Sequence, residues 1–212
     1  MHTGRSIAPI PRAASRQSGP DEVLAARSPT AILIRRITPT DHDALRLFYA
    51  TLSDESRRTR FLGSTNGIGD GQSTYFCCPD HDHREGFVAT IDASGTSGAS
   101  GTHGASGAVG ASGTSEQIVG HICIEPDGPA CAEVAVAVAD ELRGRGIGRR
   151  LVRTAIDWSR RDGFRTLTAT MLAGNPPIQR LLTSLGLPTT ARVLGAGVIE
   201  IRINLGPGGP AA

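Results

Sequence analysis

The sequence contains no lysine and no long apolar run, and each absence excludes a class of protein. Its 22 basic side chains of the Lys or Arg type are all arginines. A Walker A phosphate loop requires a lysine, so nucleotide binding of that kind is excluded. No apolar stretch is long enough to cross a membrane, and the N-terminus lacks the apolar core of a signal peptide. We therefore expect a cytoplasmic protein that does not interact with membranes.

The chain also has few cysteines and a small net charge. Four cysteines in 212 residues do not form a disulfide framework, which favours a reducing compartment. The net charge of +2 is too small to predict a nucleic-acid partner. One polar stretch combines Cys77, Cys78, His81, Asp82 and His83. Adjacent cysteines and a His-x-His pair do not reproduce the usual zinc-ligand spacing, so we predict a polar loop and no metal site.

Composition divides the chain into one domain and three biased segments. Residues 1–30 lack hydrophobic periodicity and predict a disordered tail, and residues 206–212 predict a second tail. Residues 93–115 lie within four copies of a six-residue repeat that begins Ala-Ser-Gly; three copies end in glycine and the fourth ends in Glu116. With almost no apolar side chains, this tract predicts a flexible insertion at a hairpin tip. A hexapeptide β-helix would need an apolar residue at a fixed repeat position. The ordered domain is expected over residues 31–205.

Hydrophobic periodicity predicts the elements of that domain. Helices are expected from residue 38, over 53–61, from 147 to 163, and from 176 after an Asn175 cap. Residues 63–80 have no clear pattern and predict a loop. Strands are expected at 31–37, 86–91, 116–124, 166–172, 190–194 and 198–205, and at a central strand ending near Val138.

The central strand leads into the most informative stretch of the chain. Val134, Val136 and Val138 alternate with smaller side chains, which is typical of a strand, and a glycine-rich loop and an amphipathic helix follow. Glycine lets a backbone approach a phosphate closely, and the first turn of a helix presents free N–H groups to an anion. The loop therefore predicts a pyrophosphate site composed of Gly144, Gly146, Gly148, Arg143, Arg145 and Arg149.

The spacing within this loop distinguishes among phosphate-binding families. A Rossmann fingerprint would place glycine at position 149, where this chain has arginine. An ordinary glycine-rich turn between strand and helix is the simpler alternative. The order Arg143-x-x-Gly146-x-Gly148 resembles the acetyl-CoA loop of the GCN5-related N-acetyltransferases, the GNAT family. Asn175, followed by a leucine-rich helix that ends at Leu-Gly, adds to this resemblance.

A finer resemblance concerns the second helix. The stretch Leu52-Ser-Asp-Glu-Ser-Arg57, with Arg60 and Phe61, is similar to bacterial GNAT domains of the protein-lysine acetyltransferase type. In those enzymes this region lies on the acceptor side of the cleft. The resemblance covers about residues 31–205.

The family resemblance implies the fold and the cofactor. It implies an α/β (α+β) fold whose mixed, mostly antiparallel sheet is flanked by about four helices and splayed at the acetyl-CoA site. Acetyl-CoA would be the acyl donor, with its pantetheine arm along the central strand and its pyrophosphate in the loop. The implied cofactor-binding residues are Val136, Val138, Arg143, Gly144, Arg145, Gly146, Ile147, Gly148, Arg149 and Asn175.

Acetyl transfer also requires a base, because a lysine amine with a pKa near 10.4 is protonated at neutral pH. Glu133 lies on the strand face of Ala135 and Ala137, and in the similar subgroup a glutamate at the matching place is the base, often through water. Glu125 is the second candidate. Many GNAT enzymes also place a tyrosine acid seven residues after the asparagine. Leu182 stands there, which leaves water to protonate the thiolate.

The acceptor is the least determined part of this prediction. The second-helix resemblance favours a protein lysine, acetylated by direct transfer in a ternary complex. A floor of small apolar residues without an acidic cluster would also suit one lysine side chain better than a polycationic small molecule. A small-molecule amine acetyltransferase and a catalytically silent acyl-CoA-binding domain remain the alternatives.

Overall fold

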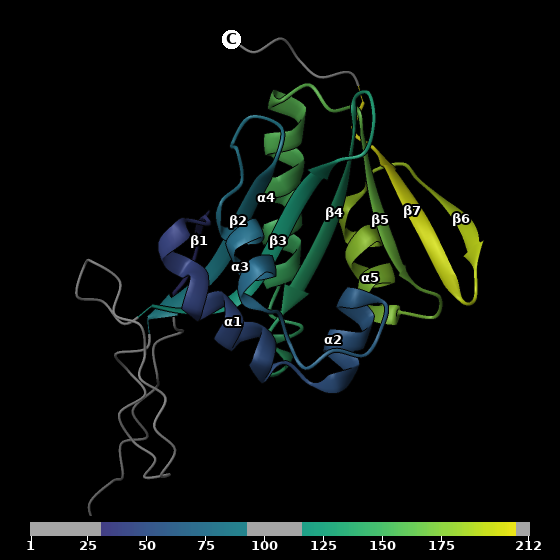
Figure 1. Ribbon diagram of the computed structural model, residues 1–212. Helices are drawn as coiled ribbons and strands as arrows, with labels where there is room; N and C mark the ends of the chain where they lie inside the picture. The colour runs from purple at the N-terminus through teal and green to yellow at the C-terminus, as the bar shows by residue number, and fades with distance from the viewer. Residues whose placement is uncertain (1–30, 93–115, 207–212) are drawn as a thin grey trace, which may run out of the picture.

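The computed structural model describes residues 31–92 and 116–206 (Figure 1). The predicted tail at residues 1–30, the repeat at 93–115 and residues 207–212 lie outside the described residues. The single domain expected over residues 31–205 stays a prediction.

One mixed sheet of seven strands forms the centre of the domain, in the order β1-β2-β3-β4-β5-β7-β6. Every neighbouring pair is antiparallel except β4 and β5, which run parallel. This confirms the expected mixed, mostly antiparallel sheet. The strands are β1 (Ile32–Arg36), β2 (Glu85–Asp92), β3 (Glu116–Pro126), β4 (Cys131–Val138), β5 (Thr166–Leu172), β6 (Thr189–Gly195) and β7 (Val198–Asn204).

Helices cover the sheet, and Figure 1 shows α1, α2 and α3 in front of it and α4 behind it. A parallel strand pair needs a long crossover, and α4 supplies it between β4 and β5. Helix α4 packs on β2, β3 and β4 and also contacts α5. No helix of the described segments has the length and apolar character needed to span a membrane. The helices are α1 (His42–Thr51), α2 (Asp54–Phe61), α3 (Asp70–Cys77), α4 (Ile147–Arg161) and α5 (Pro176–Leu185).

The ends of α4 and α5 follow the predicted signals. Leu151, Ala155 and Trp158 are buried on one face of α4, as their spacing indicates. At α5 the Asn175 side chain accepts a hydrogen bond from the backbone N–H of Ile178, which is the expected cap. These two helices therefore fix the position of the chain within the β4–β5 crossover and directly after β5.

Helix α3 contradicts the loop predicted at residues 63–80, and it brings the α-helix count in the described residues to five rather than about four. Only Gln72 among its eight residues is a strong helix former, so its intrinsic helix propensity is low. Tertiary packing stabilises it instead, because Phe76 and Cys77 are buried in the core. The Ser73 hydroxyl also donates to the carbonyl of His42 at 2.9 Å.

Candidate functional site

The sheet opens in its middle, where β4 and β5 part. The two strands pair only from Cys131 to Glu133 on β4, opposite Thr166 to Thr168 on β5. In the described part of the chain, residues 134–138 of β4 therefore have no partner on their β5 side, although they stay paired with β3. This is the splayed sheet that the sequence predicts, and it leaves backbone hydrogen-bonding groups available to a ligand.

The glycine loop that follows β4 lies at the N-terminus of α4. Gly144 and Gly146 have φ angles of 77° and 80°, in the left-handed region that favours glycine. Gly146 is the N-cap residue of α4, so the loop ends where the free N–H groups of the first helical turn begin. Arg145 and Arg149 are exposed, and neither guanidinium forms a hydrogen bond or ion pair with another described residue. The loop therefore has the features of an anion site.

Arg143 has a different environment from the other two loop arginines. Its guanidinium lies 3.2 Å from the Asp140 carboxylate and donates to the Ser56 hydroxyl at 2.6 Å. Ser56 belongs to α2, so Arg143 joins the glycine loop to that helix. The sequence predicts this arginine only as a phosphate ligand and does not indicate the contact with α2.

Asp140 is the centre of this connection. Its carboxylate accepts hydrogen bonds from the Ser53 backbone N–H at 2.8 Å, from the Ser53 hydroxyl at 3.1 Å and from the Ser56 hydroxyl. Ser53 is the N-cap of α2. The two serines of the Leu-Ser-x-Glu-Ser motif thus bind an acidic residue that lies just before the glycine loop. This arrangement fixes α2 to the loop.

We expect Asp140→Ala to lower the free energy of unfolding by about 1 kcal/mol at pH 7, because the Ser53 N–H and the two serine hydroxyls lose their acceptor. Burial raises the pKa of Asp140, but the Ser53 N–H, the Ser56 hydroxyl and Arg143 outweigh burial and lower it below 3.8. A lowered pKa contributes stability above the ordinary value and loses it as the pH falls. The difference between the proteins should therefore disappear in acid. Urea unfolding at pH 7 and pH 3 measures it, with exposed Glu141→Ala as the control.

Glu133 lies at the last β4 position that pairs with β5. Its side chain is exposed, and its Oε1 accepts a hydrogen bond from the Thr170 hydroxyl of β5 at 3.0 Å. It forms no ion pair with any residue that the structure describes. A carboxylate held by one neutral hydroxyl keeps capacity to accept a proton, directly or through water. Thr170 was not a predicted site residue.

Glu125, the second candidate base, faces Glu133 across the β3–β4 pair. Its Oε2 lies 2.8 Å from Nε of Arg84 and accepts a hydrogen bond from the Tyr75 hydroxyl at 2.8 Å. These contacts already engage the Glu125 carboxylate with a cation and a hydroxyl donor. The environments of the two glutamates therefore favour Glu133 as the base.

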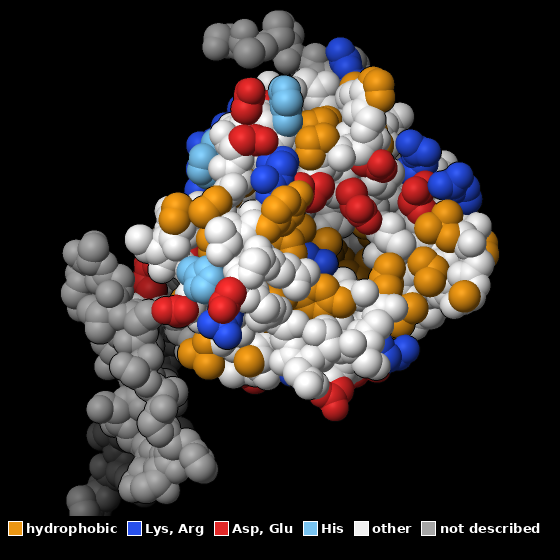
Figure 2. Space-filling model, in the orientation of Figure 1, with side chains coloured by type: hydrophobic (Ala, Val, Ile, Leu, Met, Phe, Trp, Pro, Cys, Tyr) orange, Lys and Arg blue, Asp and Glu red, His pale blue; other side chains and the backbone are white. Residues whose placement is uncertain are grey.

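A third glutamate extends the pair into a row. Glu200 of β7 is the register partner of Thr170, so it lies on the same sheet face as Glu133. Arg192 lies 3.4 Å and Arg202 3.9 Å from the Glu200 carboxylate. Figure 2 shows acidic side chains gathered over β4, β5 and β7, beside a hollow edged by hydrophobic side chains. The expected floor without acidic residues is therefore wrong, because sheet pairing brings together glutamates that are distant in the sequence.

The row nevertheless contains only one uncompensated charge. Arg84 neutralises Glu125 at one end, and Arg192 with Arg202 neutralises Glu200 at the other. Glu133, in the middle, is the carboxylate left for a cationic ligand.

The remaining predicted residues lie at the starts of α4 and α5: Ile147 and Gly148 begin α4, where the Ile147 side chain is buried in the core, and Asn175 is the N-cap of α5. The Asn175 side-chain oxygen caps the helix, which leaves the amide N–H groups to bind a ligand. Leu182 is partly buried against the core, as its apolar side chain dictates. Neither tyrosine of the chain lies on α5, because Tyr49 is on α1 and Tyr75 on α3. A tyrosine acid on α5 is therefore absent.

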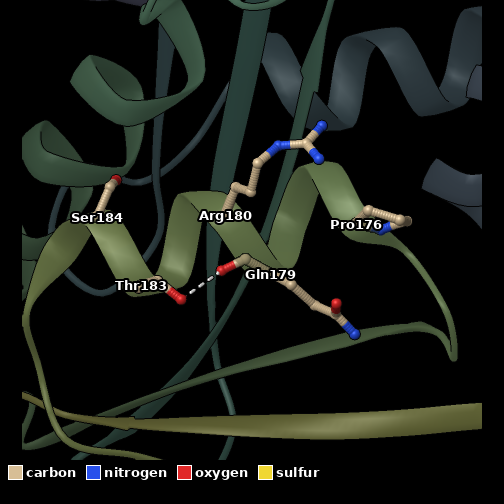
Figure 3. Close-up of a pocket in the computed structure, with 5 residues that line it drawn as sticks. All are labelled: Pro176, Gln179, Arg180, Thr183 and Ser184. Carbon is tan, nitrogen blue, oxygen red and sulfur yellow. Dashed lines mark hydrogen bonds between the residues drawn. The ribbon is translucent and has the colours of Figure 1, made fainter.

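A separate hollow of about 440 Å³ runs along the exposed side of α5, lined by Pro176, Gln179, Arg180, Thr183 and Ser184 (Figure 3). The Thr183 hydroxyl donates to the carbonyl of Gln179 at 3.0 Å within this helix. No carboxylate, imidazole or thiol lines the hollow, so it offers no base or nucleophile. We place the chemistry at Glu133 instead.

The loop before β2 brings together one group of possible metal ligands. Ligand atoms of Asp82, His83 and Asp162 lie within 4.8 Å of one another, with His83 Nδ1 3.6 Å from Asp162 Oδ2. Asp82 and His83 are exposed, and exposed acidic groups often gather without an ion. The expected absence of a metal remains a prediction.

Known proteins match this chain over most of its described length. It is 27% identical over 159 residues to an acetyltransferase of Pseudomonas aeruginosa, covering 73% of this chain and 74% of that protein. The GNAT domain of S. lividans PAT superposes with a TM-score of 0.63 at 23% identity, covering 81% of this chain and 89% of that domain. A putative acetyltransferase from Salmonella typhimurium, solved with its cofactor acetyl-CoA, superposes with a TM-score of 0.59 at 18% identity, covering 83% and 95%.

These similarities agree with the divided sheet and the glycine loop. The two structural matches establish the fold. The model of the acetyltransferase (GNAT) family matches residues 72–187, which is more than half of the chain and includes β4, the glycine loop and α5. The chain belongs to the GNAT acetyltransferase family.

Proposed function

We propose that this acyltransferase moves the acetyl group of acetyl-CoA to the side-chain amine of a protein lysine, by direct transfer in a ternary complex. The family establishes an acetyltransferase with acetyl-CoA as donor. The acceptor and the residue roles are our proposal. The observation that carries it is the single uncompensated carboxylate, Glu133, at the point where β4 leaves β5.

Each part of the site has a role in this reaction. The free edge of β4 beyond Glu133 pairs with the pantetheine arm, and a backbone N–H of that edge polarises the thioester carbonyl. The N–H groups at the start of α4, with Arg145 and Arg149, bind the pyrophosphate. Asn175 contributes its amide N–H groups.

Glu133 accepts the proton of the incoming ammonium, directly or through water. The neutral amine nitrogen bonds to the acetyl carbon, the carbon–sulfur bond breaks, and the thiolate leaves. The second amine proton passes to water, which leaves the amide. Water protonates the thiolate, because no tyrosine is available on α5.

The charge pattern favours one amine over a polycation. A polyamine or aminoglycoside would bind best to several free carboxylates, but arginines already occupy those on either side of Glu133. A lysine brings a single ammonium on an apolar stem that packs on Ala135 and Ala137.

We propose the cytoplasm as the location of this protein. Its four cysteines are all unpaired, which agrees with a reducing compartment.

We expect a higher kcat/KM for a folded protein lysine than for any free amine. The measurement is CoA release with acetyl-CoA and a panel of purified proteins, peptides and small amines, with mass spectrometry to locate the acetyl group. A free amine with a kcat/KM far above every protein would support the small-molecule alternative. Acetyl-CoA binding without CoA release from any acceptor would support the silent binding domain.

A further inference from the structure

Arg60 is a cation on the acceptor side of the site that the proposed chemistry does not use. It lies in the last turn of α2, a helix that contacts β4 and β5. Its guanidinium carbon lies 5.0 Å from the ring centroid of Phe61 and 5.7 Å from that of Phe76. Its Nη2 lies 3.3 Å from the Cys123 sulfur on β3. The charged group is therefore partly buried between aromatic rings and the sheet.

Arg60 has no anionic partner among the described residues. No carboxylate lies within ion-pair distance, and its Nε is shielded from solvent without a hydrogen-bond acceptor. The acceptor that Nη2 does contact, the Cys123 sulfur, is a weak one, so the guanidinium is unfavourably placed, because cations in proteins are normally paired or hydrated. Other arginines near the cleft differ in this respect, since Arg84 binds Glu125 and Arg143 binds Asp140.

The polar groups around Arg60 are all neutral at pH 7. Burial raises the pKa of Tyr49 to about 12 and lowers the pKa of His121 to about 3. Burial also raises the pKa of the Cys123 thiol. Tyr49 and His121 bond to each other at 2.9 Å between the hydroxyl and Nδ1. None of these groups therefore compensates the charge of Arg60.

The sheet register relates Arg60 to the proposed base. Cys123, which Arg60 contacts, faces Ala135 across the β3–β4 pair, and Ala135 is two residues from Glu133 on the same face. Diagonal neighbours on such a pair lie roughly 7–8 Å apart. One face of the cleft thus presents the Glu133 carboxylate and, at Cys123 about one diagonal step away, the Arg60 guanidinium without an anionic partner, with the small Ala135 side chain beside both.

We propose that Arg60 binds a carboxylate of the acceptor, close to the amine that becomes acetylated. A guanidinium binds a carboxylate through paired hydrogen bonds that the neutral amide cannot reproduce. This inference rests on the proposed function, in which Glu133 receives the acceptor amine. For a protein acceptor, the carboxylate belongs to an acidic residue beside the reactive lysine.

The test compares two peptides that differ only in Glu or Gln next to the single lysine. The wild-type protein should acetylate the Glu peptide with a kcat/KM about 10 to 100 times higher, the usual value of a hydrogen bond to a charged group. Arg60→Gln should reduce this ratio to about 1 through a higher KM for the Glu peptide, while kcat for the Gln peptide stays unchanged. Arg58→Gln is the control, since Arg58 lies on the same helix but is exposed and pairs with Glu55.

Several results would overturn the proposal or separate it from the proposed function. Equal rates for the two peptides with the wild-type protein, or an unchanged preference in folded Arg60→Gln, exclude a carboxylate at Arg60. The wild-type comparison stands even where the variant does not fold. If neither peptide reacts, the result counts against protein-lysine acetylation, which is the proposed function. Arg60 is then tested separately by comparing the acetylation rates of 6-aminohexanoate and 6-aminohexanamide. If the kcat/KM for 6-aminohexanoate is at least 10-fold higher than for 6-aminohexanamide, and Arg60→Gln loses this preference, Arg60 binds the carboxylate of a small acceptor. Equal kcat/KM values for the two compounds overturn the proposal.

Discussion

Glu133→Gln should lower kcat for acetyl transfer by about 10²- to 10⁴-fold, the usual range for a positioned base. The amide has nearly the shape of the carboxylate and can still accept from Thr170, but it cannot take a proton from the acceptor. Acetyl-CoA affinity should be retained, because Glu133 is not part of the glycine loop. The loss should shrink as the pH rises towards the ordinary lysine pKa near 10.4, where free amine becomes abundant. Initial rates from pH 6.5 to 9.5, with calorimetry for acetyl-CoA, measure both effects.

Glu125→Gln is the matched control for this experiment. Glu125 faces Glu133 across the β3–β4 pair, but its carboxylate is already bonded to Arg84 and Tyr75. Its substitution should change kcat by less than about 10-fold, well below the range for a lost base. A wild-type rate at neutral pH for Glu133→Gln, with a large loss for Glu125→Gln, would reverse the assignment.

Gly146→Val should abolish measurable acetyl-CoA binding, with an expected loss of affinity of at least about 100-fold. The φ of 80° at Gly146 is unfavourable for any residue with a Cβ, and valine is branched at that atom. Apart from its neighbours in the chain, no described residue lies within 4 Å of the position of that Cβ, so the substitution leaves the core packing intact. Its effects are a distorted loop and a side chain at the surface where a pyrophosphate would lie against the backbone. Calorimetry on the folded variant measures the affinity.

Gly128→Val separates loss of the site from backbone strain. Gly128 lies between β3 and β4 with a φ of 94°, and nothing lies within 4 Å of its Cβ position either. Both variants carry a left-handed valine and should lose similar stability, about 1–2 kcal/mol. Only Gly146→Val should lose acetyl-CoA. Unchanged affinity in Gly146→Val would show that the loop does not hold the pyrophosphate.

The elements with strong periodicity were predictable from the sequence. All seven strands, and α1, α2, α4 and α5, lie within a few residues of their predicted positions. The capping residues Ser53 and Asn175 also act as expected. Helix α3 was missed because its residues carry no helical signal of their own. Ser73, Phe76 and Cys77 show their helical spacing only when α1 and the core are in place beside them.

The parts of the site that lie close together in the sequence were predictable, but the contacts that form between strands of the sheet were not. The glycine loop and Glu133 lie within one short stretch, so their chemistry could be recognised locally. Thr170 and Glu200 meet Glu133 through strand pairing, over sequence separations of 37 and 67 residues that periodicity does not encode. Arg143 was predicted for its charge, but its contact with Ser56 depends on how α2 docks.

The separation of β4 from β5 also couples acetyl-CoA binding to the stability of the folded protein. Residues 134–138 of β4 form a strand edge that only the native sheet assembles. A ligand that pairs with this edge binds the native state and not the unfolded chain. Binding of the ligand then raises the free energy of unfolding. The increase is about 2.7 kcal/mol when the free ligand concentration is 100 times its dissociation constant. The supply of acetyl-CoA in the cell would thus influence how much of this protein survives as well as how fast it works.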